Sequence, residues 1–223
     1  MMRKQLYVDS RVDADGLYSK AVYLSAALSF DMGLRPGNVR KADGRDKEDH
    51  CIRAGDIVFR VQGDGGEVRI KGGQDVRCFL LKGVNGTDRV IGADVYVWTS
   101  KTFNRGQKPI APKQIGRGTI FGELLLVDLC EFMVRSGVME GDEFCTRYST
   151  TKSGATTRTV VTSKSLNEAI KAACMQFGLP GANFSSKSLR SGFATHMESC
   201  GISREDMFSR AGWSVKSRVP DTH

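Results

Sequence analysis

Lys187 and Arg190 are the residues of this chain whose types and spacing best suit chemistry on an anion. They stand three positions apart in a segment where Leu189, Phe193 and Met197 recur at helical spacing, so both cations should share one face of a helix. A planar guanidinium can donate two hydrogen bonds to one phosphate, and an ammonium beside it adds a second charge. The pair therefore predicts a phosphate-binding face, and the alternative is the solvated basic rim of a core helix.

Three other short motifs carry residues suited to the same chemistry. The sequence has GLRPGNV at residues 33–39, TSKT at residues 99–102 and AGW at residues 211–213, besides LRSGFATH at residues 189–196. In this order the four motifs resemble the landmarks of the catalytic domain of the tyrosine recombinases, the phage-type integrase family. They span most of the chain, and the first motif is similar to that of recombinases from eukaryotic mobile elements.

The resemblance implies a metal-independent enzyme that cleaves and rejoins DNA strands through a phosphotyrosyl intermediate, without a cofactor. Arg35 and Arg190 would stabilise the charge that develops on the nonbridging oxygens of the phosphate. Lys101 would protonate the leaving 5′ oxygen, and Lys187 would assist proton transfer or bind a nonbridging oxygen. Trp213 would donate its indole N–H to the phosphate or pack beside it, and an ordinary buried tryptophan is the alternative.

The chain departs from the family pattern in two places. Asn38 stands where the family usually has an acidic residue that supports the first arginine. The nucleophilic tyrosine is missing, because its place falls near Thr222 and no tyrosine follows Tyr148. Residues 219–223 end abruptly, and the amino-terminal DNA-clamping domain of relatives has no counterpart before the first helix. We therefore expect an excised catalytic domain that is inactive alone; replacement of the tyrosine and loss of cleavage are the alternatives.

Composition and charge are consistent with a DNA partner. The 33 Lys and Arg residues against 25 Asp and Glu give a formal charge of +8, which favours a polyanion. A chain of 223 residues suits one catalytic domain over residues 1–223, with residues 63–89 as a candidate insertion.

The six cysteines contain no C-x-x-C pair and the three histidines form no cluster, which argues against a disulfide framework or a metal site. No long apolar span or secretory leader occurs, so we expect an intracellular protein that accompanies double-stranded DNA, in the nucleus or the prokaryotic cytoplasm, with no membrane partner.

Other basic residues are candidates for contacts with the DNA backbone. Arg105 and Lys108 follow the TSKT motif, and Lys152 and Arg158 belong to a Thr- and Ser-rich loop predicted at residues 150–163. Phosphate contacts position a protein on DNA without reading its sequence. The alternative for this loop is a mobile surface segment with no DNA contact.

The helices and strands predicted along the chain give an α+β fold, mostly helical, with a small antiparallel sheet and a hairpin. A first core helix should begin near Asp13 or Asp15 and stop at Gly33. Arg35 follows in the turn, and Pro36 should open a second, short helix. Strands are predicted at residues 57–61, 67–71, 76–81, 94–100 and 108–115, and further helices at residues 120–135, 165–177, 185–200 and 204–210.

Three details of these elements bear on the site. Lys101 would stand at the hairpin formed by the last two strands, whereas Lys113 lies beyond the turn and is a poorer candidate for the general acid. A solvated residue that protects a sheet edge is the alternative for Lys101. A capping box at Ser165 should open the helix at residues 165–177, and Phe177 in that helix and Cys200 in the next should point inward.

Two other functions remain open. A noncatalytic DNA-binding protein derived from a recombinase would bind duplex DNA with a steep salt dependence but would not nick it. A type IB topoisomerase-like enzyme shares the arginine, lysine and tyrosine chemistry, although FATH at residues 193–196 fits recombinases better. Relatives act as tetramers by exchanging a carboxy-terminal segment, which implies a homo-oligomer on DNA, while this chain alone is expected to be monomeric.

Overall fold

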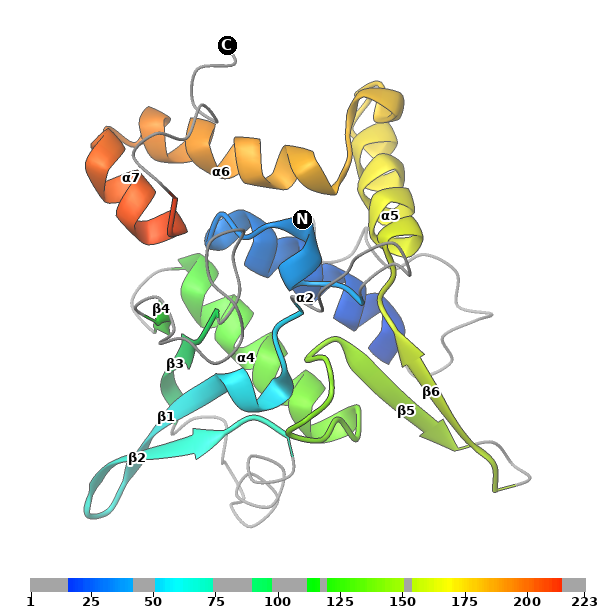
Figure 1. Cartoon of the computed structure of the whole chain (residues 1–223), viewed down its shortest axis with the longest axis vertical. Coiled ribbons are helices and arrows are strands. Elements are labelled where there is room, and N and C mark those ends of the chain that lie inside the picture. The colour runs from blue at the N-terminus through cyan, green and yellow to red at the C-terminus, as the bar shows by residue number, and fades with distance from the viewer. Residues whose placement is uncertain are drawn as a thin grey trace.

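The computed structural model describes residues 16–41, 51–73, 90–97, 112–116, 120–150 and 154–213. In this part of the chain, five α-helices accompany a four-stranded antiparallel sheet and a separate two-stranded hairpin (Figure 1). The fold is therefore mixed α+β, as predicted. In chain order the elements are α2 (Leu17–Asp31), η1 (Pro36–Asn38), η2 (Ala54–Asp56), β1 (Ile57–Gly63), β2 (Gly66–Lys71), β3 (Val90–Val95), β4 (Lys113–Gly116), α4 (Ile120–Arg135), β5 (Thr146–Thr150), β6 (Thr156–Val160), α5 (Ser163–Gln176), η4 (Gly181–Asn183), α6 (Ser186–Ser199) and α7 (Arg204–Ala211).

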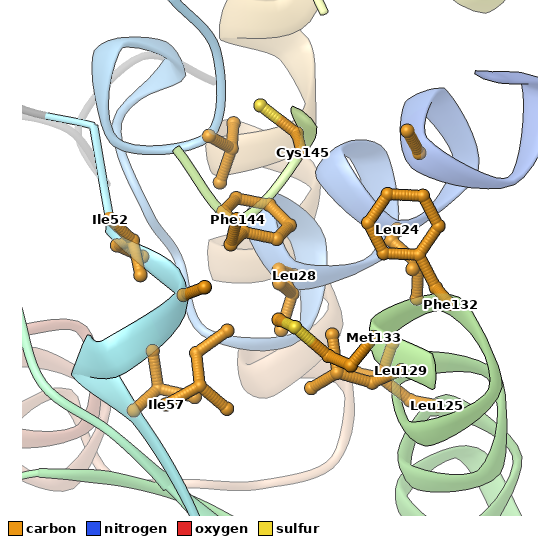
Figure 2. Packing of buried hydrophobic residues seen from close by; sticks show 14 of the residues in the cluster. Leu24, Leu28, Ile52, Ile57, Leu125, Leu129, Phe132, Met133, Phe144 and Cys145 are labelled. Carbon is orange, nitrogen blue, oxygen red and sulfur yellow. The ribbon is translucent and has the colours of Figure 1, made fainter. Parts of the chain in front are cut away.

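Helix α2 contacts α4, α5 and α6 and so lies at the centre of the described residues (Figure 1). Leu24 and Leu28 are fully buried on it, because they recur at helical spacing on the side that faces the other elements. Figure 2 shows these leucines in one cluster with Phe132 and Met133 of α4 and Ile57 of β1. This core fixes the end of α2, and with it the loop that carries the first predicted arginine.

The four-stranded sheet has the order β2-β1-β3-β4, and each neighbouring pair is antiparallel. Lys113, the first residue of β4, lies opposite Val95 of β3. Helix α4 packs against both β3 and β4. The sheet and α4 together therefore hold Lys113 at a defined position.

Several predicted elements are confirmed. β1, β2, α4, α6 and α7 begin and end within two residues of their predicted bounds. Pro36 opens the short helix η1 with Arg35 as its N-cap, and Ser203 caps α7 through a hydrogen bond to the Asp206 N–H. Helix α2 begins at Leu17, slightly later than predicted.

One loop prediction and one strand prediction were wrong. In the loop predicted at residues 150–163, Thr150 ends β5 and residues 156–160 form β6; the two strands pair as a hairpin whose threonines are β-branched and favour extended backbone. The strand predicted at residues 94–100 overlaps β3, which begins earlier, at Val90, and ends at Val95, where Val95 pairs with Ile57 of β1; residues 98–100 lie outside the described residues. The strand predicted at residues 76–81 lies outside the described residues.

Three predictions about helix ends were also wrong. Helix α5 starts one turn before the predicted capping box, and the Thr162 hydroxyl accepts a hydrogen bond from the Ser165 N–H at 3.2 Å. Phe177 follows the last residue of α5 and is 49% exposed. Cys200 is likewise the C-cap of α6 and is exposed. Both residues lie past the last helical turn, where helical periodicity no longer determines which way a side chain points.

Helices α2 and α4 are joined by an ion-pair cluster around Lys20. Its Nζ lies 3.3 Å from Oδ1 of the buried Asp128 and also donates a hydrogen bond to Glu131. Burial alone would raise the pKa of Glu131, but hydrogen bonds from Lys20 and Arg135 outweigh burial and lower it. The folded chain therefore favours the charged form of Glu131 more than the unfolded chain does.

Replacing Glu131 with glutamine should lower the free energy of unfolding at neutral pH by about 0.5–1 kcal/mol, since the carboxylate is partly exposed and screened. The stabilisation is present above the unfolded pKa of Glu131 and is lost as pH falls through the lower folded pKa. Urea unfolding at neutral and acidic pH should show the wild type and Glu131→Gln converging in acid. The matched control, Glu168→Gln, removes an exposed carboxylate 3.9 Å from Lys164 and should change stability very little. Equal losses in the two variants would contradict the prediction.

Candidate anion-binding site

The backbone oxygen of Gly33, in the turn after α2, accepts hydrogen bonds from two distant side chains. Arg190 Nη1 on α6 donates to it at 3.0 Å, and the Trp213 indole Nε1 after α7 donates at 3.3 Å. The Arg190 guanidinium carbon also lies 4.3 Å from the centroid of the Trp213 ring, within the range of a cation–π contact. Two of the predicted site residues thus meet at the loop that leads to a third, Arg35.

Gly33 is required at this point for two independent reasons. Its φ angle is 59°, in the left-handed region that side chains disfavour. A Cβ at this position would lie 2.8 Å from Phe193 Cδ1 and 3.1 Å from Ala211 Cβ. The absence of a side chain therefore allows α6 and α7 to approach the Gly33 carbonyl.

A second, small hydrophobic cluster between α6 and α7 holds Trp213 in place. Phe193 of α6 and Phe208 of α7 lie with their ring centroids 5.9 and 5.8 Å from that of Trp213. Gly212 adopts a left-handed conformation at the end of α7, and the Trp213 N–H donates to the Phe208 oxygen at 2.9 Å. The turn after α7 therefore aims the indole at the Gly33 carbonyl.

Arg35 is held by a turn that the side-chain amide of Asn38 closes. The buried Asn38 accepts a hydrogen bond from the Arg35 backbone N–H through Oδ1, at 3.2 Å. The amide thus fixes the backbone of η1 without adding negative charge beside the half-buried Arg35 side chain.

The positive charges of Arg35 and Arg190 repel each other at this site. Burial, followed by the positive charge of Arg35, lowers the pKa of the Arg190 guanidinium from 12.5 to about 10. Arginine nevertheless stays protonated at neutral pH, so the site carries both charges at an electrostatic cost. Among the residues that the structure describes, no carboxylate forms an ion pair with Arg35 or Arg190. An anion between the two side chains would remove that cost.

Lys113 is a third cation at the same place, and it was not among the predicted site residues. Its half-buried side chain donates a hydrogen bond to the backbone oxygen of Arg210 in the last turn of α7. Burial, followed by the positive charge of Arg190, lowers the pKa of Lys113 from 10.5 to about 8. The sequence carries no direct signal for Lys113, because its position depends on how α7 packs beside β4. We call Arg35, Lys113, Arg190, Trp213 and the Gly33 carbonyl the cation site.

Other predicted residues do not join the cation site or cannot be placed. Lys187 is exposed in the first turn of α6, one turn before Arg190. Arg158 lies on the β5–β6 hairpin, which projects away from α6 and α7 (Figure 1), and it forms ion pairs with Glu143 and Asp142. The remaining candidates lie outside the described residues; they are Lys101, Arg105, Lys108 and Lys152.

No protein-family model matches this sequence, and comparison with curated proteins finds no match. Within the described ranges, no group of three or more His, Cys, Asp and Glu side chains is arranged to hold a metal ion. None of the helices in those ranges is long and apolar enough to cross a membrane. Function is therefore best argued from the side chains that meet at Gly33.

Proposed function

We propose that this chain is the catalytic domain of a DNA strand transferase of the tyrosine-recombinase type, whose cation site binds one phosphodiester of duplex DNA. The observation that carries the proposal is the meeting of Arg35, Lys113 and Arg190 without a carboxylate partner among the described residues. Three cations in one place favour a strongly anionic ligand, and a protein of formal charge +8 attracts a polyanion. The ordered motifs that resemble recombinases supply the choice of DNA over other phosphates.

In this proposal the arginines act on the phosphate rather than on the nucleophile. Attack of an oxygen nucleophile on phosphorus adds negative charge to the nonbridging oxygens, and the bond to the 5′ oxygen breaks as that oxygen takes a proton. Arg35 and Arg190 would bind the nonbridging oxygens from the start, so no reorganisation is needed as the charge grows. The Gly33 carbonyl and the Trp213 ring would hold the Arg190 fork in the required plane.

Tyr148, the last tyrosine in the sequence, is a poor candidate for the nucleophile. It lies on β5, and its hydroxyl donates a hydrogen bond to Asp142 Oδ1 at 3.0 Å. Burial, followed by that hydrogen bond and the charge of Asp142, raises the pKa of Tyr148. The proposal therefore assigns phosphate binding to this chain and does not assign the nucleophile to Tyr148.

A noncatalytic DNA-binding protein is the second candidate. The observation that favours it is the cation site itself, because its side chains can bind a phosphate without any nucleophile beside them. Such a protein would keep the cation site as a phosphate contact and would have no strand-cleaving activity under any condition.

Duplex binding tests the part that both candidates share. Arg35→Ala should weaken binding of a short fluorescent DNA duplex by about tenfold, because one charge-assisted contact contributes about 1.5 kcal/mol. Arg135→Ala is the matched control, since it removes the same charge from an exposed arginine of α4 that pairs with Glu131. Anisotropy titrations should show a small change for the control, and equal weakening in both variants would mean that only net charge matters.

Strand cleavage separates the two candidates. Supercoiled plasmid can be incubated with the protein and hydrogen peroxide, a small external nucleophile, with a chelator present to suppress metal-driven damage. A strand transferase should nick the plasmid in a peroxide-dependent reaction that Arg35→Ala abolishes and Arg135→Ala retains. Tight binding without such nicking would select the noncatalytic candidate instead.

A further inference from the structure

Lys113 extends from the first position of β4 to the carboxyl end of α7. Its Nζ donates to the Arg210 oxygen, one of the last carbonyls of that helix. Such carbonyls lack partners within the helix and carry partial negative charge, so an ammonium is well placed beside them. An ammonium has three N–H donors, and the contact with Arg210 leaves others for a second acceptor.

The sheet keeps the carboxylate of Asp94 away from Lys113. Asp94 of β3 lies opposite Gln114, the next residue of β4, so its side chain is on the other face of the sheet. There Asp94 pairs with Arg69 at 3.2 Å. On its own face Lys113 experiences the positive charge of Arg190 from α6.

The helices packed nearby supply no counter-charge either. Helix α4 also packs against β4 and carries Glu123, Asp128 and Glu131, of which the last two bind Lys20. On α7, the exposed Arg210 guanidinium adds another positive charge. The carboxylates of α7, Glu205 and Asp206, lie in its first turn, at the opposite end of the helix from the Arg210 oxygen that Lys113 contacts. In the described residues, no Asp or Glu forms an ion pair with Lys113.

We propose that Lys113 is a third phosphate-contacting cation of the cation site, positioned by the carboxyl end of α7 and effective only as an ammonium. The inference rests on the proposed function, because the phosphate is taken to be a DNA phosphodiester. It extends that function to a residue outside the four sequence motifs, and it makes phosphate binding sensitive to pH.

The titration of Lys113 supports this geometry. Burial and then Arg190 lower its pKa to about 8, so its ammonium gives up its proton in mildly alkaline solution. Between about pH 8 and 10.5 the unfolded chain holds a proton that the folded chain has released, so stability rises with pH in that window. The charged form of Lys113 thus destabilises the folded chain when no anion is bound. A bound anion should raise the pKa of Lys113 again.

A structural strut is the competing explanation. If Lys113 only joined β4 to α7, its replacement would change stability without changing how anion binding depends on pH. The two explanations therefore differ in the pH profile of binding, which arginine at this position should flatten because it stays charged.

Lysine titration by NMR tests the site without DNA. Protein with ¹³C-labelled lysine side chains can be titrated with inorganic sulfate, a permanent anion, at constant ionic strength. The Lys113 signal is identified by its absence in Lys113→Arg. We expect its pKa to rise by about one unit when sulfate binds, whereas the Lys164 signal should not respond. If sulfate left the pKa of Lys113 unchanged, the inference would be overturned.

Duplex binding at different pH values tests the same residue on DNA. Wild-type affinity should fall about tenfold from about pH 7 to about pH 9, as the ammonium is lost. Lys113→Arg should bind equally at both pH values, and Lys113→Met should bind at both as weakly as the wild type does in alkali. Lys164→Arg, the exposed control, should keep the wild-type profile. If the duplex affinity of Lys113→Arg fell with rising pH as that of the wild type does, the role of Lys113 would be overturned and the DNA proposal would stand. If sulfate raised the pKa of Lys113 but the protein did not bind duplex DNA, the role of Lys113 would be supported and the DNA proposal overturned.

Discussion

Replacing Arg190 with lysine should weaken duplex binding by about 10- to 100-fold, although the positive charge is retained. The guanidinium donates to the Gly33 oxygen at 3.0 Å and stacks 4.3 Å from the Trp213 ring centroid, and its other N–H groups remain for the phosphate. An ammonium has no planar fork and cannot make these contacts together. Anisotropy titrations should show the loss of affinity, and peroxide-dependent nicking should fall to the background level.

Two further variants make this result specific. Trp213→Phe keeps an aromatic ring under Arg190 but removes the indole N–H that donates to Gly33, so it should lose only a few-fold in affinity, about 1 kcal/mol. Arg135→Lys makes the same chemical change on the exposed surface of α4 and should bind as the wild type does. Thermal unfolding establishes that each variant is folded. Wild-type affinity in a folded Arg190→Lys variant would show that the cation site does not bind the phosphate.

The sequence predicted the helices that carry the site better than it predicted the sheet. Leu24 and Leu28 recur at helical spacing, and Ser185 caps α6, so these helices could be placed from local signals alone. The position of β3 could not, because the pairing of Val95 with Ile57 is a contact between distant residues. Local patterns are weakest where a strand partner decides the register.

At the site too, local sequence signals predicted some features, whereas contacts between distant segments determine the others. Three of the four motifs predicted Arg35, Arg190 and Trp213, and the fold brings these side chains together, while their roles stay predictions. The shared acceptor at Gly33 and the contribution of Lys113 could not be predicted. Both depend on α6 and α7 packing against segments far earlier in the chain, and no spacing in the sequence encodes that approach.

The largest structural effect is expected at Gly33. Gly33→Ala should lower the free energy of unfolding by about 2–5 kcal/mol. A side chain at positive φ costs about 1–2 kcal/mol, and crowding in a packed core adds about 1–3 kcal/mol. The φ angle is 59°, and the added Cβ would lie 2.8 Å from Phe193 Cδ1. Because Phe193 is packed against Trp213, relief of the clash must move the two donors relative to the Gly33 oxygen. Urea unfolding measures the first effect, and duplex affinity of the folded variant measures the second.

Two other glycines separate the causes. Gly201 has a φ of 71° with no atom within 4 Å of an added Cβ, so Gly201→Ala should lose only the conformational term, about 1–2 kcal/mol. Gly65 in the β1–β2 turn has open space and no positive φ, so Gly65→Ala should be nearly neutral. Neither control should change duplex affinity, since neither glycine touches the cation site. If Gly33→Ala cost no more than Gly201→Ala and kept full affinity, the close approach of α6 and α7 at Gly33 would not be what holds Arg190 and Trp213 in place.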